Sequence, residues 1–258
     1  MKSSCEPPAV RVAIVGDFQI GKSSLVNSLL AESLAETGEG FSPTTDAVSE
    51  YTFAPGICLV DTPGFNDKRP ELTRLSEDEI QKADAVVFVQ TDKVLESRKV
   101  DLLHAAERKP VVVLYNCWHT THGQLGWILD AKVNVDACSK IRSQLASGGM
   151  ESSLLPINGK SVVPVNVLWA QFGLGQPING DQGDQDIADF ASRKLGIVST
   201  GDALRAEMLK RSGFLPVRDF LKNLPLELLK HAVTHPEQEI NRIVDSFAAE
   251  LKKRWSAA

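Results

Sequence analysis

The eight residues GDFQIGKS, at positions 16–23, constrain the fold more than any other part of this chain. A short apolar run rich in β-branched residues, 10–15, stands directly before them, and residues 23–34 follow with apolar side chains at helical spacing. Two glycines with four residues between them, followed by Lys and Ser, fit a loop whose backbone N–H groups surround a phosphate. The order strand, loop, helix therefore predicts an α/β fold with a phosphate site where the strand ends.

Further strands and helices alternate along the chain, which favours a mostly parallel sheet with helices on both faces. The turn 54–56, Ala-Pro-Gly, joins two of the strands in a predicted hairpin, and Ser76 to Glu79 resembles the capping box of a helix. The six predicted strands are 10–15, 48–53, 57–60, 85–89, 111–115 and 162–167, and the later helices are 76–82, 96–108 and 125–145.

The composition changes after residue 170, which suggests three parts. Residues 1–8 are expected to form a disordered N-terminus, 9–170 an α/β domain, and 171–258 a polar exposed loop followed by helices packed on that domain. The loop is predicted over 171–185, and the helices over 186–195, 201–210, 214–221 and 236–255.

Charge and composition exclude several classes of protein. The formal net charge is -5 and no basic tract is present, so we expect no binding to nucleic acid. No apolar run is long enough to cross a bilayer, and residues 1–8 lack the apolar core of a secretory signal. The four cysteines lie far apart without a CxxC pair, which favours reduced thiols in a cytoplasmic protein.

The phosphate loop predicts the role of its neighbours. Lys22 is expected to reach the β- and γ-phosphates, and the Ser23 hydroxyl to bind Mg²⁺. The run Asp-Thr-Pro-Gly follows the strand 57–60; Asp61 is placed to hold Mg²⁺ through water, and the Gly64 N–H to sense the γ-phosphate. The loop residues expected to contact the nucleotide are Gly16, Asp17, Phe18, Gln19, Ile20, Gly21, Lys22, Ser23 and Ser24.

The segments GDFQIGKSS, SPTTD and DTPGF together resemble the P-loop GTPases of the translation-factor-related class. Within that class the chain is similar to the bacterial dynamin-like and Era-like branch, of which GKSSLVNSLL is typical, and the resemblance covers about residues 9–170. It implies a Ras-like G domain with a six-stranded sheet that binds Mg²⁺ with GTP or GDP. It also implies a switch threonine over Mg²⁺ and the γ-phosphate, for which Thr45 is favoured and Thr44 is second.

The same resemblance bears on hydrolysis. Phe65 stands where Ras-like proteins carry a glutamine that orients water, so the resemblance implies that backbone groups position the water and that the protein dimerises across the nucleotide. Gln19 replaces the asparagine with which some relatives bind potassium, and its amide is a hypothetical donor to the β–γ bridging oxygen. The catalytic candidates are Lys22, Thr45, Gly64 and Gln19, and the metal ligands are Ser23, Thr45 and Asp61.

The base site departs from the family. The family reads guanine with [NT]KxD after the strand that here is 111–115, but this chain has Asn116, Cys117, Trp118 and His119. Only Asn116 matches, and a neutral imidazole at His119 accepts a single hydrogen bond. A backbone N–H at Asn166 or Val167 remains as a contact for guanine O6.

Three hypotheses on function follow. The first is a GTPase acting as a switch or assembly-coupled hydrolase, the second an NTPase that tolerates adenine, and the third a nucleotide-binding interaction module with little hydrolysis. The expected partners are a guanine nucleotide, a second copy across the nucleotide and an effector protein. About 90 residues follow the last strand, too few for a dynamin-like stalk, so membrane contact is expected only through a partner.

Overall fold

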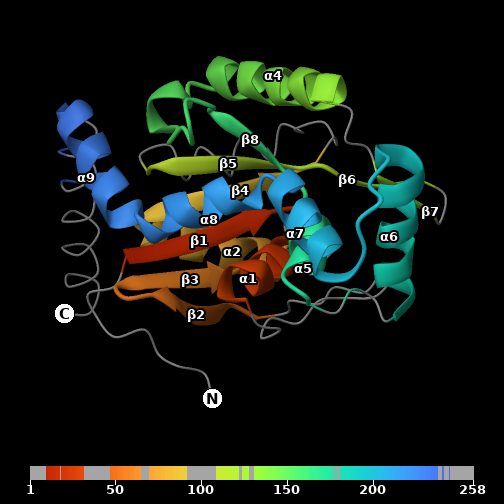
Figure 1. The fold of residues 1–258 in the computed structure, drawn as a ribbon. Coiled ribbons are helices and arrows are strands. Elements are labelled where there is room, and N and C mark those ends of the chain that lie inside the picture. The colour runs from red at the N-terminus through yellow and green to blue at the C-terminus, as the bar shows by residue number, and fades with distance from the viewer. Residues whose placement is uncertain are drawn as a thin grey trace.

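The computed structural model describes residues 10–17, 19–31, 47–64, 70–91, 109–121, 124–127, 131–176, 178, 181–237, 240 and 244. Several predictions lie outside these residues, namely the N-terminus 1–8, Phe18, Thr44, Thr45, Phe65, the helix 96–108 and most of the helix 236–255. Figure 1 shows the described elements as a central sheet with helices on both sides.

The main sheet has six strands in the order β2-β3-β1-β4-β5-β8, which confirms the predicted number and the mostly parallel arrangement. Five strands are parallel neighbours, and β2 alone is antiparallel, paired with β3 through the predicted hairpin turn. The strands are β1 (Val10–Gly16), β2 (Ser49–Ala54), β3 (Ile57–Asp61), β4 (Ala85–Gln90), β5 (Val111–Asn116) and β8 (Val162–Val165). The central strands read as continuous apolar runs because helices bury them from both sides.

Two layers of helices cover the sheet. One hydrophobic cluster joins β1, β3, β4 and β5 to α1 (Lys22–Leu30), α5 (Val167–Gly173) and α8 (Phe214–Lys222). The cluster on the opposite face joins the sheet to α2 (Pro70–Lys82) and α4 (Ala131–Ser147). The chain order reverses at β1, whose neighbours are β3 and β4, and this is where an α/β sheet binds its ligand.

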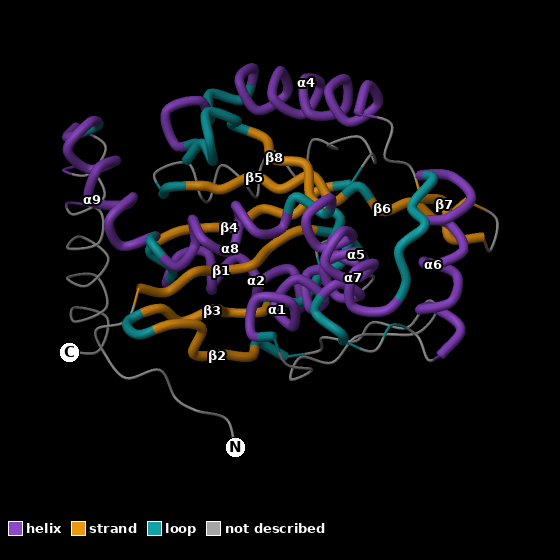
Figure 2. Tube along the Cα trace, viewed as in Figure 1, coloured by secondary structure: helices purple, strands orange, loops and turns teal. Residues whose placement is uncertain are grey.

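Three further helices complete the described fold: α6 (Asp181–Leu195), α7 (Gly201–Arg211) and α9 (Leu224–Thr234). Helices α5, α6 and α7 share a third core around the fully buried Trp169. Figure 2 shows these helices in purple beside the strands of the sheet in orange. Gly173 lets α5 and α7 approach closely, because a Cβ there would lie 2.5 Å from the Leu209 Cβ. Among the described residues no helix has the length and apolar character needed to span a bilayer.

The exposed loop predicted over 171–185 is wrong. Helix α5 continues through Gly173 and α6 begins at Asp181, while Gln171 and Gln176 are buried. Gln176 can be buried because its Nε2 donates to the Asn27 carbonyl of α1 at 2.8 Å. A polar composition therefore misled the prediction where the polar groups have partners inside the protein.

Three other predictions need correction. The helix predicted over 125–145 begins only at Ala131, and a hairpin of β6 (Trp118–Thr121) and β7 (Gln124–Trp127) precedes it. Ser76 does not start a helix, because α2 begins at Pro70 and Ser76 lies on its buried face. Cys117 and Cys138 are free as expected, but Cys58 is disulfide-bonded.

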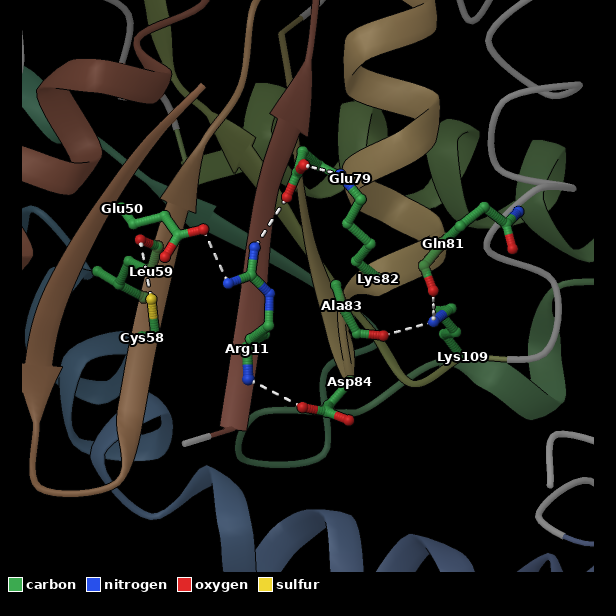
Figure 3. A network of polar contacts seen from close by, with 10 residues as sticks. All are labelled: Arg11, Glu50, Cys58, Leu59, Glu79, Gln81, Lys82, Ala83, Asp84 and Lys109. Atoms are coloured by element: carbon green, nitrogen blue, oxygen red, sulfur yellow. Dashed lines mark hydrogen bonds and ion pairs between the residues drawn. The ribbon is translucent and has the colours of Figure 1, made fainter. Parts of the chain in front are cut away.

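A polar network fixes the end of the sheet opposite the phosphate loop (Figure 3). Arg11 of β1 donates to Glu50 of β2 at 2.8 Å and to Glu79 of α2 at 2.9 Å, and its backbone N–H donates to Asp84 at 2.9 Å. Lys82 adds a contact of 2.6 Å to Glu79. Arg11 thus links strand β2, which follows residues 32–46, to helix α2, which follows residues 65–69.

Candidate functional site

The loop between β1 and α1 has a backbone path that only glycine allows at two positions. Gly16 has φ 151°, and a Cβ there would lie 2.3 Å from the Val89 carbonyl oxygen. Gly21 has φ 91°, and its Cβ would lie 2.7 Å from the Asn116 Nδ2. The loop therefore packs against the ends of β4 and β5, and α1 begins immediately after it with its N–H groups at the loop.

Lys22 is buried beneath this loop. Its Nζ donates to the Asp17 carbonyl at 2.9 Å, which keeps the cation inside the loop. Burial lowers the pKa of Lys22 to about 8, although Asp61 and Asp17 act in the opposite direction. A cation held in this way gains a strong partner when a phosphate enters, because the phosphate replaces the solvation that burial has removed.

Ser23 and Asp61 meet across the loop. The Ser23 Oγ donates to Asp61 Oδ2 at 2.8 Å, and Asp61 is 1% exposed. Its other oxygen, Oδ1, is buried without a hydrogen-bond partner among the described residues. The pKa of Asp61 is raised, because burial outweighs the opposing effects of Lys22, the Ser23 hydroxyl and the Thr62 backbone. A hydroxyl beside a buried carboxylate with unused lone pairs is a donor set that suits Mg²⁺.

The segment after β3 is fixed on two sides. The Thr62 Oγ1 donates to the Ile14 carbonyl of β1 at 2.9 Å, and the Ser76 Oγ of α2 donates to the Pro63 carbonyl at 2.9 Å. Sequence reasoning missed both contacts. The sequence signal for Ser76 was its position four residues after Leu72 and four residues before Ile80, which places it on the same buried face of the helix.

Asn116 joins three loops at the opposite side of the site. Its Nδ2 donates to the Ile20 carbonyl at 2.8 Å, and its Oδ1 accepts from the Val167 N–H at 3.2 Å. The Asn166 N–H donates to the Ser212 carbonyl at 2.8 Å, so both backbone N–H groups that were considered for guanine O6 have acceptors inside the protein. The Asn166 side chain accepts from the Trp169 N–H at 3.0 Å and caps α5.

Cys117 is buried in the core on the α2 and α4 face, not extended like the lysine that it replaces. Burial, reinforced by Cys138, raises the pKa of its thiol to about 12, so it stays neutral. His119 lies in β6 opposite Gly126, and its side chain is outside the described residues. The hairpin that carries His119 was missed; its sequence signal was the β-branched pair Thr120 and Thr121, followed by His122 and then Gly123.

The remaining predicted residues lie where the loop places them. Gln19 is exposed with φ 56°, Asp17 and Ile20 are buried, and Ser24 is half-buried in the first turn of α1. The structure thus brings together Lys22, Ser23 and Asp61, with Asn116 holding the loop from the side.

Comparison with known proteins agrees with this geometry. Residues 11–117 match the family model described as "50S ribosome-binding GTPase". The tRNA modification GTPase MnmE of Bacillus cereus is 32% identical over 114 residues, and that of Heliobacterium modesticaldum is 36% identical over 113. These alignments cover 42% and 41% of this chain, and 25% and 24% of the relatives. The chain thus spans about a quarter of the length of the curated relatives that it matches.

Two solved structures of Era are also similar. Era of Aquifex aeolicus bound to GDP and AlF4⁻ has a TM-score of 0.47 and 20% identity, covering 61% of this chain and 50% of that one. Era in complex with MgGDPNP and part of 16S ribosomal RNA has a TM-score of 0.46 and 19% identity, covering 62% of this chain and 51% of that one. Residues 11–117, with their sheet order and phosphate loop, are thus similar to the P-loop GTPases that this family model describes.

Proposed function

We propose that this protein binds GTP with Mg²⁺ and hydrolyses it to GDP and phosphate. The observation that carries the proposal is the contact between Ser23 and Asp61 beside the buried Lys22. It supports a site in which one cation faces the β- and γ-phosphates while a hydroxyl and a carboxylate face the metal.

Each residue has a distinct part in this proposal. Lys22 neutralises the charge that develops on the β–γ bridge, and the N–H groups of the loop hold the phosphates in line. Ser23 binds Mg²⁺ directly and Asp61 through water; when bound, Mg²⁺ neutralises the phosphate oxygens. Gly64 contributes its N–H to the γ-phosphate. Gln19 and Thr45 complete the proposed site, Gln19 at the bridging oxygen and Thr45 over the metal.

The base half of the site supports a second candidate, an NTPase that tolerates adenine. The observation that favours it is Cys117, which packs into the core and leaves the base without the lysine stem of the family. Discrimination against adenine also needs an acceptor for the guanine N–H groups, and His119 offers only one. We favour GTP because the phosphate motifs and the family match point to GTPases.

Binding of fluorescent GDP and ADP to nucleotide-free protein with Mg²⁺ tests the choice. A preference for GDP of about 100-fold or more supports the GTPase, and equal binding or a preference for ADP supports the second candidate. The variant His119→Ala tests whether the hairpin reads the base, because it lowers the preference only if His119 lies there. Lys22→Ala is the negative control, since it removes phosphate binding for both nucleotides.

The wider role follows the same proposal. The protein then acts as a switch or assembly-coupled GTPase that speeds its own hydrolysis by pairing with a second copy across the nucleotide. Turnover per molecule that rises with protein concentration supports pairing, and turnover that stays constant argues against it.

A further inference from the structure

A serine inside α2 contacts the segment that follows β3. Ser76 is fully buried, and its Oγ lies 2.9 Å from the Pro63 carbonyl oxygen and 3.2 Å from the Leu72 carbonyl oxygen. Such a residue is unfavourable on the apolar face of a helix unless its hydroxyl has a partner. The Pro63 carbonyl, which lies outside α2, is therefore the hydrogen-bond partner that explains a serine at this buried position.

The single proton of the Ser76 hydroxyl is best placed on Pro63. The contact to Pro63 is the shorter one, and Leu72 stands four residues before Ser76, where its carbonyl accepts the backbone N–H of α2. The Thr62 hydroxyl is 3.4 Å from the Pro63 oxygen but 2.9 Å from the Ile14 oxygen, so its proton serves β1. Among the described residues, Ser76 is thus the main donor to the Pro63 carbonyl.

The hydrogen bond from Ser76 to the Pro63 carbonyl also sets the orientation of the Gly64 N–H. The Pro63 C=O and the Gly64 N–H belong to one planar trans peptide and point in opposite directions. A donor that holds the oxygen therefore sets the direction of the N–H. Gly64 is the residue whose N–H is assigned to the γ-phosphate.

We propose that Ser76 is a positioning residue that orients the Gly64 N–H for the γ-phosphate and transmits its state to α2. The inference rests on the proposed function and adds to it a residue outside the phosphate and base motifs. The Ser76 bond ties the Gly64 peptide to the middle of α2.

The first test compares Ser76→Ala with wild type in binding GDP and a non-hydrolysable GTP analogue. The variant is expected to bind GDP within about twofold of wild type, but to lose about 5- to 30-fold in affinity for the analogue, the range that one buried hydrogen bond supports. Ser28→Ala is the matched control: Ser28 is also a buried helical serine, and its Oγ donates to the Ser24 carbonyl at 2.9 Å without touching Pro63.

The second test needs no nucleotide. Labelling proline with ¹³C at the carbonyl and glycine with ¹⁵N selects only the peptides 55–56 and 63–64, the two Pro-Gly pairs of the chain. Ser76→Ala is expected to shift the Gly64 amide signal, because the bond to the carbonyl polarises the same peptide. Gly56 serves as the internal control. Ser76→Cys, of similar volume and a weak donor, is a second variant with the same but smaller change.

The outcomes separate two failures. An unchanged Gly64 signal, or equal loss of GDP and analogue affinity in Ser76→Ala, overturns the role of Ser76. A wild-type protein that binds neither GDP nor the analogue overturns the proposed function and the sensing role with it, whatever the Gly64 signal does. A shifted Gly64 signal together with a selective loss of analogue affinity supports the inference.

Discussion

Asn116 should matter for the stability of the empty protein and not only for the nucleotide. The variant Asn116→Ala removes the Nδ2 donor to the Ile20 carbonyl at 2.8 Å and the Oδ1 acceptor of the Val167 N–H at 3.2 Å. Asn116 is 2% exposed, so water does not easily replace either bond. Losing a buried partner costs about 1–3 kcal/mol per group, so for two groups we expect a loss of about 2–6 kcal/mol in the free energy of unfolding.

Urea denaturation of nucleotide-free protein measures this loss, and a fall in Tm of about 5–15 °C should accompany it. Asn223→Ala is the matched control. The Asn223 Nδ2 also donates to a carbonyl at 2.8 Å, that of Asp219, but on the surface, so its loss should stay within about 0.5 kcal/mol. Equal effects of the two variants would refute the reasoning that Asn116 joins the loops of the site.

Three further predictions follow from the same structure. The pKa of Lys22 is about 8 in the folded protein, which is below the pKa of a lysine in the unfolded chain. Between these two pKa values the unfolded state binds more protons than the folded state, so the folded state gains stability as the pH rises. In urea denaturation, the free energy of unfolding of wild type relative to Lys22→Met should therefore increase from pH 8 to pH 10. Gly173→Ala should cost about 1–3 kcal/mol in thermal unfolding by overpacking the α5–α7 contact, because the atoms nearest the added Cβ are the Leu209 Cβ and backbone atoms of α7. Ser23→Ala should weaken GDP binding in Mg²⁺ and leave binding in EDTA unchanged, as titration with fluorescent GDP will show.

The sequence predicted the elements that have strong local patterns. Apolar runs indicated most strands of the main sheet, the Ala-Pro-Gly turn indicated β2 in a hairpin, and the loop 16–23 placed the phosphate site at the end of β1. The meeting of Ser23 with Asp61, 38 residues apart, could be expected because both follow parallel neighbouring strands.

The remainder depended on contacts that no local pattern encodes. Gln176 looks like a loop residue until its bond to Asn27 is seen, and Ser76 looks like a helix cap until α2 is seen to begin six residues earlier. The hairpin β6–β7 is too short for a periodic signal and interrupts the segment in which the family motif would continue. Polar residues with distant partners are therefore where sequence reasoning failed.

Release of phosphate from GTP tests the central proposal most directly. With wild-type protein, we expect phosphate release that requires Mg²⁺ and is lost in Lys22→Ala and Asp61→Ala, while Ser28→Ala keeps the wild-type rate. Release that persists without Mg²⁺, or that survives both substitutions, would contradict a reaction at the site formed by Lys22, Ser23 and Asp61.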